Sequence, residues 1–198
     1  MQYIKRNLEN VVSQVTKEYP VLLVTGPRQV GKTTMLQKLM EGTNRGYVTL
    51  DDLNERNIAK TDPELFLQLH KPPVLIDEVQ YAPELFTYIK MHVDKTHEPG
   101  AFWLTGSQVF KLMRGVQESL AGRVAVLSLT SLSQAEISGG EMEPFVIELD
   151  ALNERRKGRE EADARGIFER IYRGSMPAIV SAVNSNSQIF YSSYLSTY

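Results

Sequence analysis

The 198-residue chain contains no cysteine, which excludes a disulfide framework and any metal site built on thiolates. A chain without cysteine fits a reducing compartment, and we expect a cytoplasmic protein. No apolar run approaches the ~20 residues that a membrane-spanning helix needs, so we expect no membrane association. The amino-terminal stretch "MQYIKRNLENVVSQ" lacks the apolar core of a secretory signal peptide.

The sequence also lacks an excess of charge of one sign. Its 24 acidic and 22 basic side chains nearly balance, and the formal net charge is −2. The chain as a whole therefore has no field that would draw it to nucleic acid or to an anionic membrane. Its hydrophobic fraction of 42% is ordinary for a soluble protein, and its length suits one domain, with or without a small appendage.

Short apolar runs alternate with segments of helical periodicity. The runs predict strands over 21–25, 47–50, 72–78, 101–107 and 123–129. The periodic segments predict helices over 2–19, 32–40 and 82–95, and a further helix that Asp62 caps and Pro63 begins. Helical pieces are also expected over 109–122. This alternation is typical of an α/β protein with a mostly parallel sheet.

The character of the sequence changes after about residue 138. Residues 153–166 are dense in both charges and lack apolar anchors, which predicts a solvated linker or an exposed helix. Helical spacing returns at 167–174, and the last twelve residues, 187–198, are rich in aromatic side chains. We therefore expect a core domain, 1–140, followed by a linker and helical extension, 141–198, that continues in a longer protein.

The strongest motif is "GPRQVGKTT" (26–34), which matches the Walker A pattern G-x-x-x-x-G-K-[ST] between an expected strand and an expected helix. Its glycines allow a tight turn in which successive N–H groups form an anion nest, next to the positive end of the helix. Lys32 can reach the β- and γ-phosphates of ATP or ADP, and the Thr33 hydroxyl can bind Mg²⁺. The alternative is a glycine turn beside an exposed lysine, but the flanking elements favour the phosphate loop. The predicted nucleotide-contacting residues are Gly26, Pro27, Arg28, Gln29, Val30, Gly31, Lys32, Thr33 and Thr34.

A second motif, "PPVLIDEVQ", predicts the acidic strand end known as Walker B. Ligands bind at the carboxyl ends of the strands in open α/β sheets, which is where Asp77 and Glu78 would lie. Asp77 suits the Mg²⁺ shell, directly or through water, and Glu78 can orient or deprotonate a water that attacks the γ-phosphate. The alternative is an acidic pair that caps a helix.

The residues around this pair also separate classes of nucleotide-binding protein. GTPases carry D-x-x-G here and N-K-x-D later, whereas this chain has "DEVQ", and its nearest N-K-x-D candidate, "AKTD" (59–62), lacks the asparagine. A guanine-specific protein is therefore disfavoured. A small-molecule P-loop kinase stays open as an alternative.

Further candidates lie in "WLTGS" (103–107) and "SLAGRV". Thr105 and Ser107 are candidates for the polar side chain that contacts both the γ-phosphate and the water, although the segment could also be a simple turn. Arg123 could stabilise transition-state charge in its own site or in a neighbour's, which would require an oligomer. Its alternative is a surface ion pair.

Three more polar residues remain open. Asp51 and Asp52 either line the site or cap the next helix. Gln80 either forms a hydrogen bond near the site or lies on the surface.

In combination, the motifs resemble the AAA-superfamily ATPases of bacteria and archaea whose C-terminal half is a domain of unknown function. The resemblance covers nearly the whole chain and is carried by "GPRQVGKTT", "LDD", "VLIDEVQYAPELF", "LTGSQVFKLM", "SLAGRV" and "GSMPAIV". It implies a P-loop NTPase three-layer sandwich with a five-stranded sheet of order 5-1-4-3-2. It also implies ATP and Mg²⁺ as ligands.

The resemblance also implies roles for individual residues. The polar side chain that contacts the γ-phosphate and the water is called the sensor. Many AAA proteins place asparagine at this sensor position, where this chain has Thr-Gly-Ser. Family members run well beyond this length. The resemblance therefore implies a further C-terminal region, and a protein or nucleic-acid partner that is engaged through it. The implied catalytic residues are Lys32, Glu78, Ser107 or Thr105, and Arg123, with Thr33 and Asp77 at the metal.

The sequence therefore predicts a Mg²⁺-dependent ATP hydrolase in which hydrolysis is coupled to conformational change. A nucleotide-gated interaction module with little turnover is the alternative of a different class.

Overall fold

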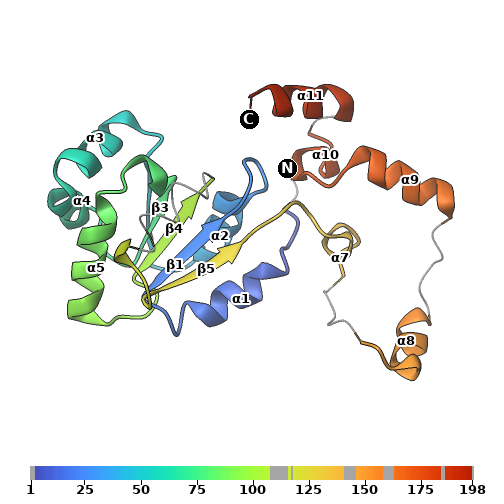
Figure 1. The fold of residues 1–198 in the computed structure, drawn as a ribbon, viewed down its shortest axis with the longest axis horizontal. Coiled ribbons are helices and arrows are strands. Elements are labelled where there is room, and N and C mark those ends of the chain that lie inside the picture. The colour runs from blue at the N-terminus through green and yellow to red at the C-terminus, as the bar shows by residue number, and fades with distance from the viewer. Residues whose placement is uncertain are drawn as a thin grey trace. The chain divides into compact units, whose positions relative to one another are not determined.

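The computed structural model describes residues 3–107, 116, 118–140, 146–157, 163–183 and 186–197 (Figure 1). The chain forms two compact units. One unit is Leu8–Thr130, and the other joins Met1–Asn7 with Ser131–Tyr198. The boundary at residue 140 between a core domain and a helical extension, which the change in sequence character suggests, stays a prediction.

The Leu8–Thr130 unit contains a five-stranded sheet in which every pair of neighbouring strands is parallel. Its order is β2-β3-β4-β1-β5, which confirms the predicted order 5-1-4-3-2. The ends of each strand lie within two residues of those expected from the sequence. The strands are β1 (Val21–Thr25), β2 (Gly46–Thr49), β3 (Val74–Asp77), β4 (Phe102–Gly106) and β5 (Val124–Ser128).

Burial follows the position of each strand in the sheet. Every residue of β1, β3 and β4, the three inner strands, is buried, whereas the edge strands β2 and β5 are partly exposed. Uninterrupted apolar runs such as "VLLV" suit strands that are covered on both faces.

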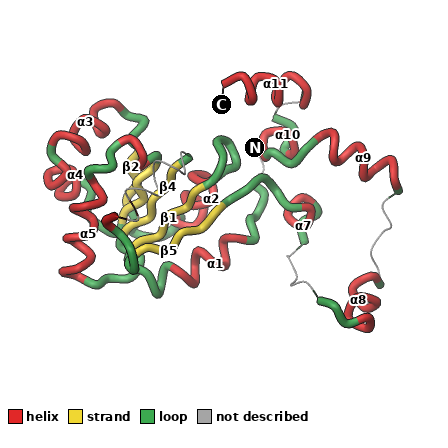
Figure 2. The backbone as a smooth tube through the Cα atoms, viewed as in Figure 1, coloured by secondary structure: helices red, strands yellow, loops and turns green. Residues whose placement is uncertain are grey.

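Helices cover both faces of the sheet, so the three-layer sandwich is confirmed (Figure 2). Residues of α3, α4 and α5 pack with alternate side chains of the inner strands, and α1 packs against α2. As predicted, Asp62 caps α4, accepting a hydrogen bond from Leu65 N, and Pro63 begins it. The helix predicted over 2–19 is shorter and begins at Leu8. The helices are α1 (Leu8–Val15), α2 (Lys32–Met40), α3 (Leu53–Thr61), α4 (Pro63–Leu69), the 3₁₀ helix η1 (Val79–Tyr81) and α5 (Leu85–Thr96).

The second unit is helical in its described part, as the extension was predicted to be. Its amino-terminal segment is held by Glu136, which pairs with Arg6 Nε at 3.1 Å and accepts a hydrogen bond from Asn7 N at 2.8 Å. The pieces expected over 109–122 lie mostly outside the described residues. No helix in the described ranges is long and apolar enough to span a bilayer. The helices are α7 (Gln134–Ile137), α8 (Leu149–Arg156), α9 (Ala164–Arg173), α10 (Pro177–Val180) and α11 (Ser187–Thr197).

Candidate nucleotide-binding site

The glycine-rich loop connects the end of β1 to the start of α2. Gly26 has a φ of 140° and lies so close to Leu129 that a Cβ on it would stand 2.0 Å from the Leu129 carbonyl oxygen. Gly31 caps α2 with a left-handed backbone, φ 93° and ψ 25°. Both positions therefore require glycine, which lets the loop turn tightly and present its backbone N–H groups.

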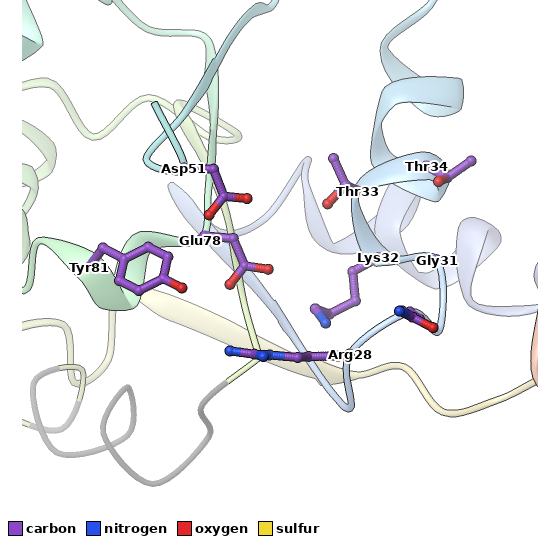
Figure 3. Close-up of a pocket in the computed structure, with 9 residues that line it drawn as sticks. Arg28, Gly31, Lys32, Thr33, Thr34, Asp51, Glu78 and Tyr81 are labelled. Carbon is purple, nitrogen blue, oxygen red and sulfur yellow. The ribbon is translucent and has the colours of Figure 1, made fainter. Parts of the chain in front are cut away.

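A cleft of ≈ 430 Å³ opens above this loop, a volume typical of small-molecule sites. It brings together much of the predicted phosphate loop with Asp51 and Glu78 (Figure 3). Val30 is instead buried in the core, where an apolar side chain belongs. The residues that line the cleft are Arg28, Gln29, Gly31, Lys32, Thr33, Thr34, Asp51, Glu78 and Tyr81.

The Lys32 side chain is 5% exposed and folds back along the loop. Its Nζ donates hydrogen bonds to the carbonyl oxygens of Gly26, at 3.0 Å, and Pro27, at 2.9 Å. Burial lowers the pKa of the Lys32 ammonium below its ordinary value; Glu78 and Asp77 act in the opposite direction. Figure 3 shows the Lys32 ammonium and the Glu78 carboxylate turned towards one another across the cleft.

Asp77 ends β3 and is buried among hydroxyl groups. Thr33 Oγ1 donates to Asp77 Oδ1 at 2.7 Å, and the Thr105 hydroxyl donates to the same oxygen. Tyr47 OH donates to Asp77 Oδ2 at 3.4 Å. A threonine hydroxyl beside a carboxylate is a hard oxygen pair, which suits Mg²⁺ because that ion takes one or two protein oxygens and fills its shell with water and phosphate.

Glu78 follows Asp77 in a left-handed conformation, φ 57° and ψ 44°, which costs about 1–3 kcal/mol for a residue other than glycine. Strain of this kind persists where the surroundings hold it, and here they do. The Glu78 N–H donates to Thr105 Oγ1 at 3.1 Å. Its Oε2 accepts hydrogen bonds from Ser107 Oγ at 3.1 Å and from Gln80 Nε2.

The two candidates on β4 and its end have different contacts. Thr105 is fully buried and bridges the Asp77 carboxylate and the Glu78 backbone. Ser107 contacts the Glu78 carboxylate itself. Because β4 lies between β1 and β3, both hydroxyls come to the carboxyl edge of the sheet, next to the phosphate loop.

Arg123 is not brought to the cleft, which corrects the expectation that it acts on its own phosphates. It precedes β5, and its carbonyl accepts a hydrogen bond from Val21 N at the start of β1, so it lies at the opposite edge of the sheet. Its guanidinium forms a two-bond ion pair with Asp94, with Nη2 3.0 Å from Oδ2. This is the surface pair that the sequence left open as the alternative.

Several contacts at the site resolve or extend the predictions. Asp51 lines the cleft, and Asp52 caps α3 by accepting hydrogen bonds from two backbone N–H groups, so the adjacent pair divides the two predicted roles. No sequence motif pointed to Tyr47 or Tyr81 as residues of the site. Tyr47 lies two residues before Thr49, which is opposite Asp77 in the β2–β3 pair, so the alignment of these two strands would have been needed to predict its contact.

Fold and site together define a P-loop nucleotide-binding protein. The family model described as an AAA domain matches residues 18–138, and the chain belongs to this family of AAA-type P-loop ATPases. The uncharacterised protein Rv2008c of Mycobacterium tuberculosis is 36% identical over 119 residues, which are 60% of this chain and 26% of that protein. The match thus spans about a quarter of the relative's length.

Two solved structures share the fold. The Walker-type ATPase PABY2304 of Pyrococcus abyssi superposes with a TM-score of 0.60 at 15% identity, covering 98% of this chain and 72% of that one. DnaA of Aquifex aeolicus, solved with AMPPCP bound, gives a TM-score of 0.51 at 14% identity, covering 88% of this chain and 57% of that one. At these identities the likeness concerns the fold alone.

Proposed function

We propose that this chain binds ATP with Mg²⁺ and hydrolyses it, and that the change of phosphate state alters the conformation of the protein. One observation carries the proposal. The phosphate loop and the acidic end of β3 meet at one cleft, where Thr33 Oγ1 lies 2.7 Å from Asp77 Oδ1 and Glu78 faces Lys32 (Figure 3).

The loop and the start of α2 would hold the phosphates. The N–H groups of the loop and the positive end of α2 favour an anion there. Lys32 would exchange its two carbonyl contacts, to Gly26 and Pro27, for the phosphate oxygens. A buried ammonium gains more from a phosphate than an exposed one, because less water screens the pair.

Thr33 and Asp77 would hold the metal ion. When bound, Mg²⁺ neutralises charge on the β- and γ-phosphate oxygens. The hydroxyls of Thr105 and Tyr47 donate to Oδ1 and Oδ2 of the Asp77 carboxylate, respectively, and would keep it oriented towards the ion. Outer contacts of this kind orient a metal ligand.

Glu78 would orient the attacking water and take its proton. The carboxylate lines the cleft, faces Lys32 and is held by Ser107 and Gln80. A fixed carboxylate suits general base catalysis, since proton transfer requires the base within hydrogen-bond reach of the water. Ser107 fills the sensor position in this proposal, because its hydroxyl contacts the Glu78 side chain.

A second function, a nucleotide-gated interaction module, is favoured by α9. Its apolar residues recur at helical spacing and are largely exposed: Ile167, Phe168, Ile171 and Tyr172. Such a face suits a protein partner that nucleotide binding would attract or release. We accordingly assign 1–140 as the ATPase core and 141–198 as the region that engages a protein or nucleic-acid partner.

The test compares the wild type with Glu78→Gln and Lys32→Ala. We expect Glu78→Gln to bind a fluorescent ATP analogue within about threefold of the wild type while turnover falls by roughly 10²-fold or more, since it loses only the base. Lys32→Ala should lose nucleotide affinity as well. Turnover by Glu78→Gln at the wild-type rate would remove Glu78 from the mechanism.

A further inference from the structure

The Glu78 carboxylate is held through a single oxygen by two donors from different parts of the chain. Ser107 Oγ donates to Oε2 at 3.1 Å from the end of β4, and Gln80 Nε2 donates to the same oxygen from η1. Oε2 accepts both bonds, and within the described residues Oε1 accepts no hydrogen bond from a side chain, so its lone pairs are left for a water. Gln80 has no part in the P-loop, in the metal pair or in the lining of the cleft.

The Gln80 amide can face Glu78 in one orientation only. If the amide were reversed, its oxygen would meet a carboxylate oxygen, and neither atom carries a hydrogen to donate. In the observed orientation Gln80 Oε1 is buried, and within the described residues it has no hydrogen-bond partner. Within the described residues, the hydrogen bond that this amide makes is therefore the one from Nε2 to Glu78.

The backbone also directs Gln80 towards Glu78. The left-handed conformation of Glu78 turns the chain straight from β3 into η1, and Tyr81 N donates to Glu78 O at 3.1 Å. Val79 and Ala82, which flank the turn, are fully buried and anchor it to the core. A turn that is fixed on both sides leaves Gln80 little freedom to move away from the carboxylate.

We propose that Gln80 is a positioning residue for ATP hydrolysis, which holds the Glu78 carboxylate, together with Ser107, so that Oε1 meets the attacking water. This inference rests on the proposed function, because it assigns Gln80 a role in the water activation attributed to Glu78. A small displacement of a base lowers the rate of proton transfer while ground-state binding of the nucleotide is unaffected. Gln80 therefore influences kcat and leaves ATP affinity alone.

The kinetic test uses Gln80→Met in the full chain, which keeps the length of the side chain and removes the donor. We expect kcat to fall by about tenfold or more, with the Kd of a fluorescent ATP analogue unchanged, since a hydrogen bond to a charged group is lost. The matched control is Gln37→Met, on the exposed surface of α2, which should keep the wild-type kcat. An unchanged kcat in Gln80→Met, or an increase, would overturn the proposal.

Coupling to Glu78 separates positioning from a general structural role. In a Glu78→Gln background, Gln80→Met should cause no further loss of residual turnover, because the group that it positions is already absent. An additional tenfold loss in that background would show that Gln80 acts by another route. Should methionine prevent folding, Gln80→Ala removes the same donor without added bulk and is measured in the same way.

A spectroscopic test decides the placement of Gln80 even if the wild type does not hydrolyse ATP. With ¹³C-labelled glutamate, the Glu78 carboxyl signal is identified by its loss in Glu78→Gln. We expect Gln80→Met to shift this signal in the absence of nucleotide, and Gln37→Met to leave it in place. An unmoved signal in Gln80→Met would refute the contact, whereas an inactive wild type with a shifted signal would refute only the proposed hydrolysis.

Discussion

The two compact units of this chain hold their apolar side chains in different ways. In Leu8–Thr130, the strands β1, β3 and β4 are buried at every position, and α5 contributes four buried residues to the same core. In the unit that contains Ser131–Tyr198, the helices α8, α9 and α11 have no buried residue in their described parts. The candidate nucleotide site belongs entirely to the first unit.

Because of this difference, the candidate site is held in place by a core, whereas the described parts of α8, α9 and α11 are not. Lys32, Asp77 and Glu78 project from elements that the core of the first unit fixes, so their mutual positions are set before any ligand binds. The apolar face of α9 is instead exposed, so the free energy that its burial would contribute depends on the partner that covers it.

The largest expected effect comes from deleting an aromatic ring in each unit. Phe86, which is 1% exposed, lies in the core, and Phe168 on α9 is 71% exposed. We expect Phe86→Ala to lower the free energy of unfolding by about 3–5 kcal/mol, and Phe168→Ala to change it by no more than ~0.5 kcal/mol. Urea unfolding followed by circular dichroism measures both. Similar losses of unfolding free energy in the two variants would contradict the difference in burial between the two units.

The second prediction concerns the phosphate loop within the first unit. In Gly26→Ala the new methyl group would meet the Leu129 carbonyl oxygen, so the loop must shift, and we expect affinity for ATP to fall by at least ~10-fold. Gly122→Ala is the control: Gly122 also has a positive φ, 76°, but nothing lies within 4 Å of its added Cβ. Isothermal titration with ATP should show a loss in the first variant only.

The third prediction concerns how the second unit responds to acid. Burial by itself raises the pKa of the Glu136 carboxyl, but the N–H groups of Ser133 and Asn7 and the Arg6 guanidinium favour its charged form, and the net shift of the pKa is downward. The carboxylate therefore stabilises the folded unit at pH values above the ordinary pKa that it has in the unfolded chain, and this contribution is lost as the pH falls through the lower pKa of the folded state.

Hydrogen exchange of the Asn7 amide, which donates to Glu136, can measure this response. We expect its protection factor to fall on acidification, by an amount that corresponds to roughly 1.5–3 kcal/mol for a hydrogen bond to a charged group. In Glu136→Gln the protection should start lower and lose its dependence on acid. Protection of Asn7 that stays constant down to pH 3 in the wild type would contradict the assignment.

The smallest effect is expected at Arg123, which lies at the amino-terminal ends of the strands, away from the nucleotide site. Arg123 is paired with Asp94 there, so Arg123→Gln should hydrolyse ATP within about twofold of the wild-type rate. Turnover measured over a range of protein concentrations makes the test complete. A large loss that appears only at high concentration would indicate that Arg123 acts on a neighbouring copy.

The fold was predictable because its signals are local. Uninterrupted apolar runs mark the inner strands, and the glycine loop and the acidic strand end can each be recognised within nine residues. The order of the sheet came from the resemblance of the combined motifs, since no single run says which strand is its neighbour.

What the sequence did not predict depends on the alignment of neighbouring strands and on local backbone conformation. The Tyr47 hydroxyl contacts Asp77 because of the way β2 is aligned with β3. The orientation of Gln80 depends on the left-handed backbone of Glu78 and on the buried turn that follows it. Arg123 lies away from the cleft of its own chain for a simple reason. A residue that precedes a parallel strand lies at the amino edge of the sheet, whereas the nucleotide site lies at the carboxyl edge.

The most direct test of the central claim is a single-turnover experiment with the protein in excess over radiolabelled ATP and with Mg²⁺ present. If Glu78 activates water beside the phosphate loop, the wild type will convert the bound ATP to ADP and phosphate within minutes, and Glu78→Gln will keep it bound and intact. ATP that stays intact on the wild-type protein for hours, despite tight binding, would contradict the hydrolase and favour the nucleotide-gated module.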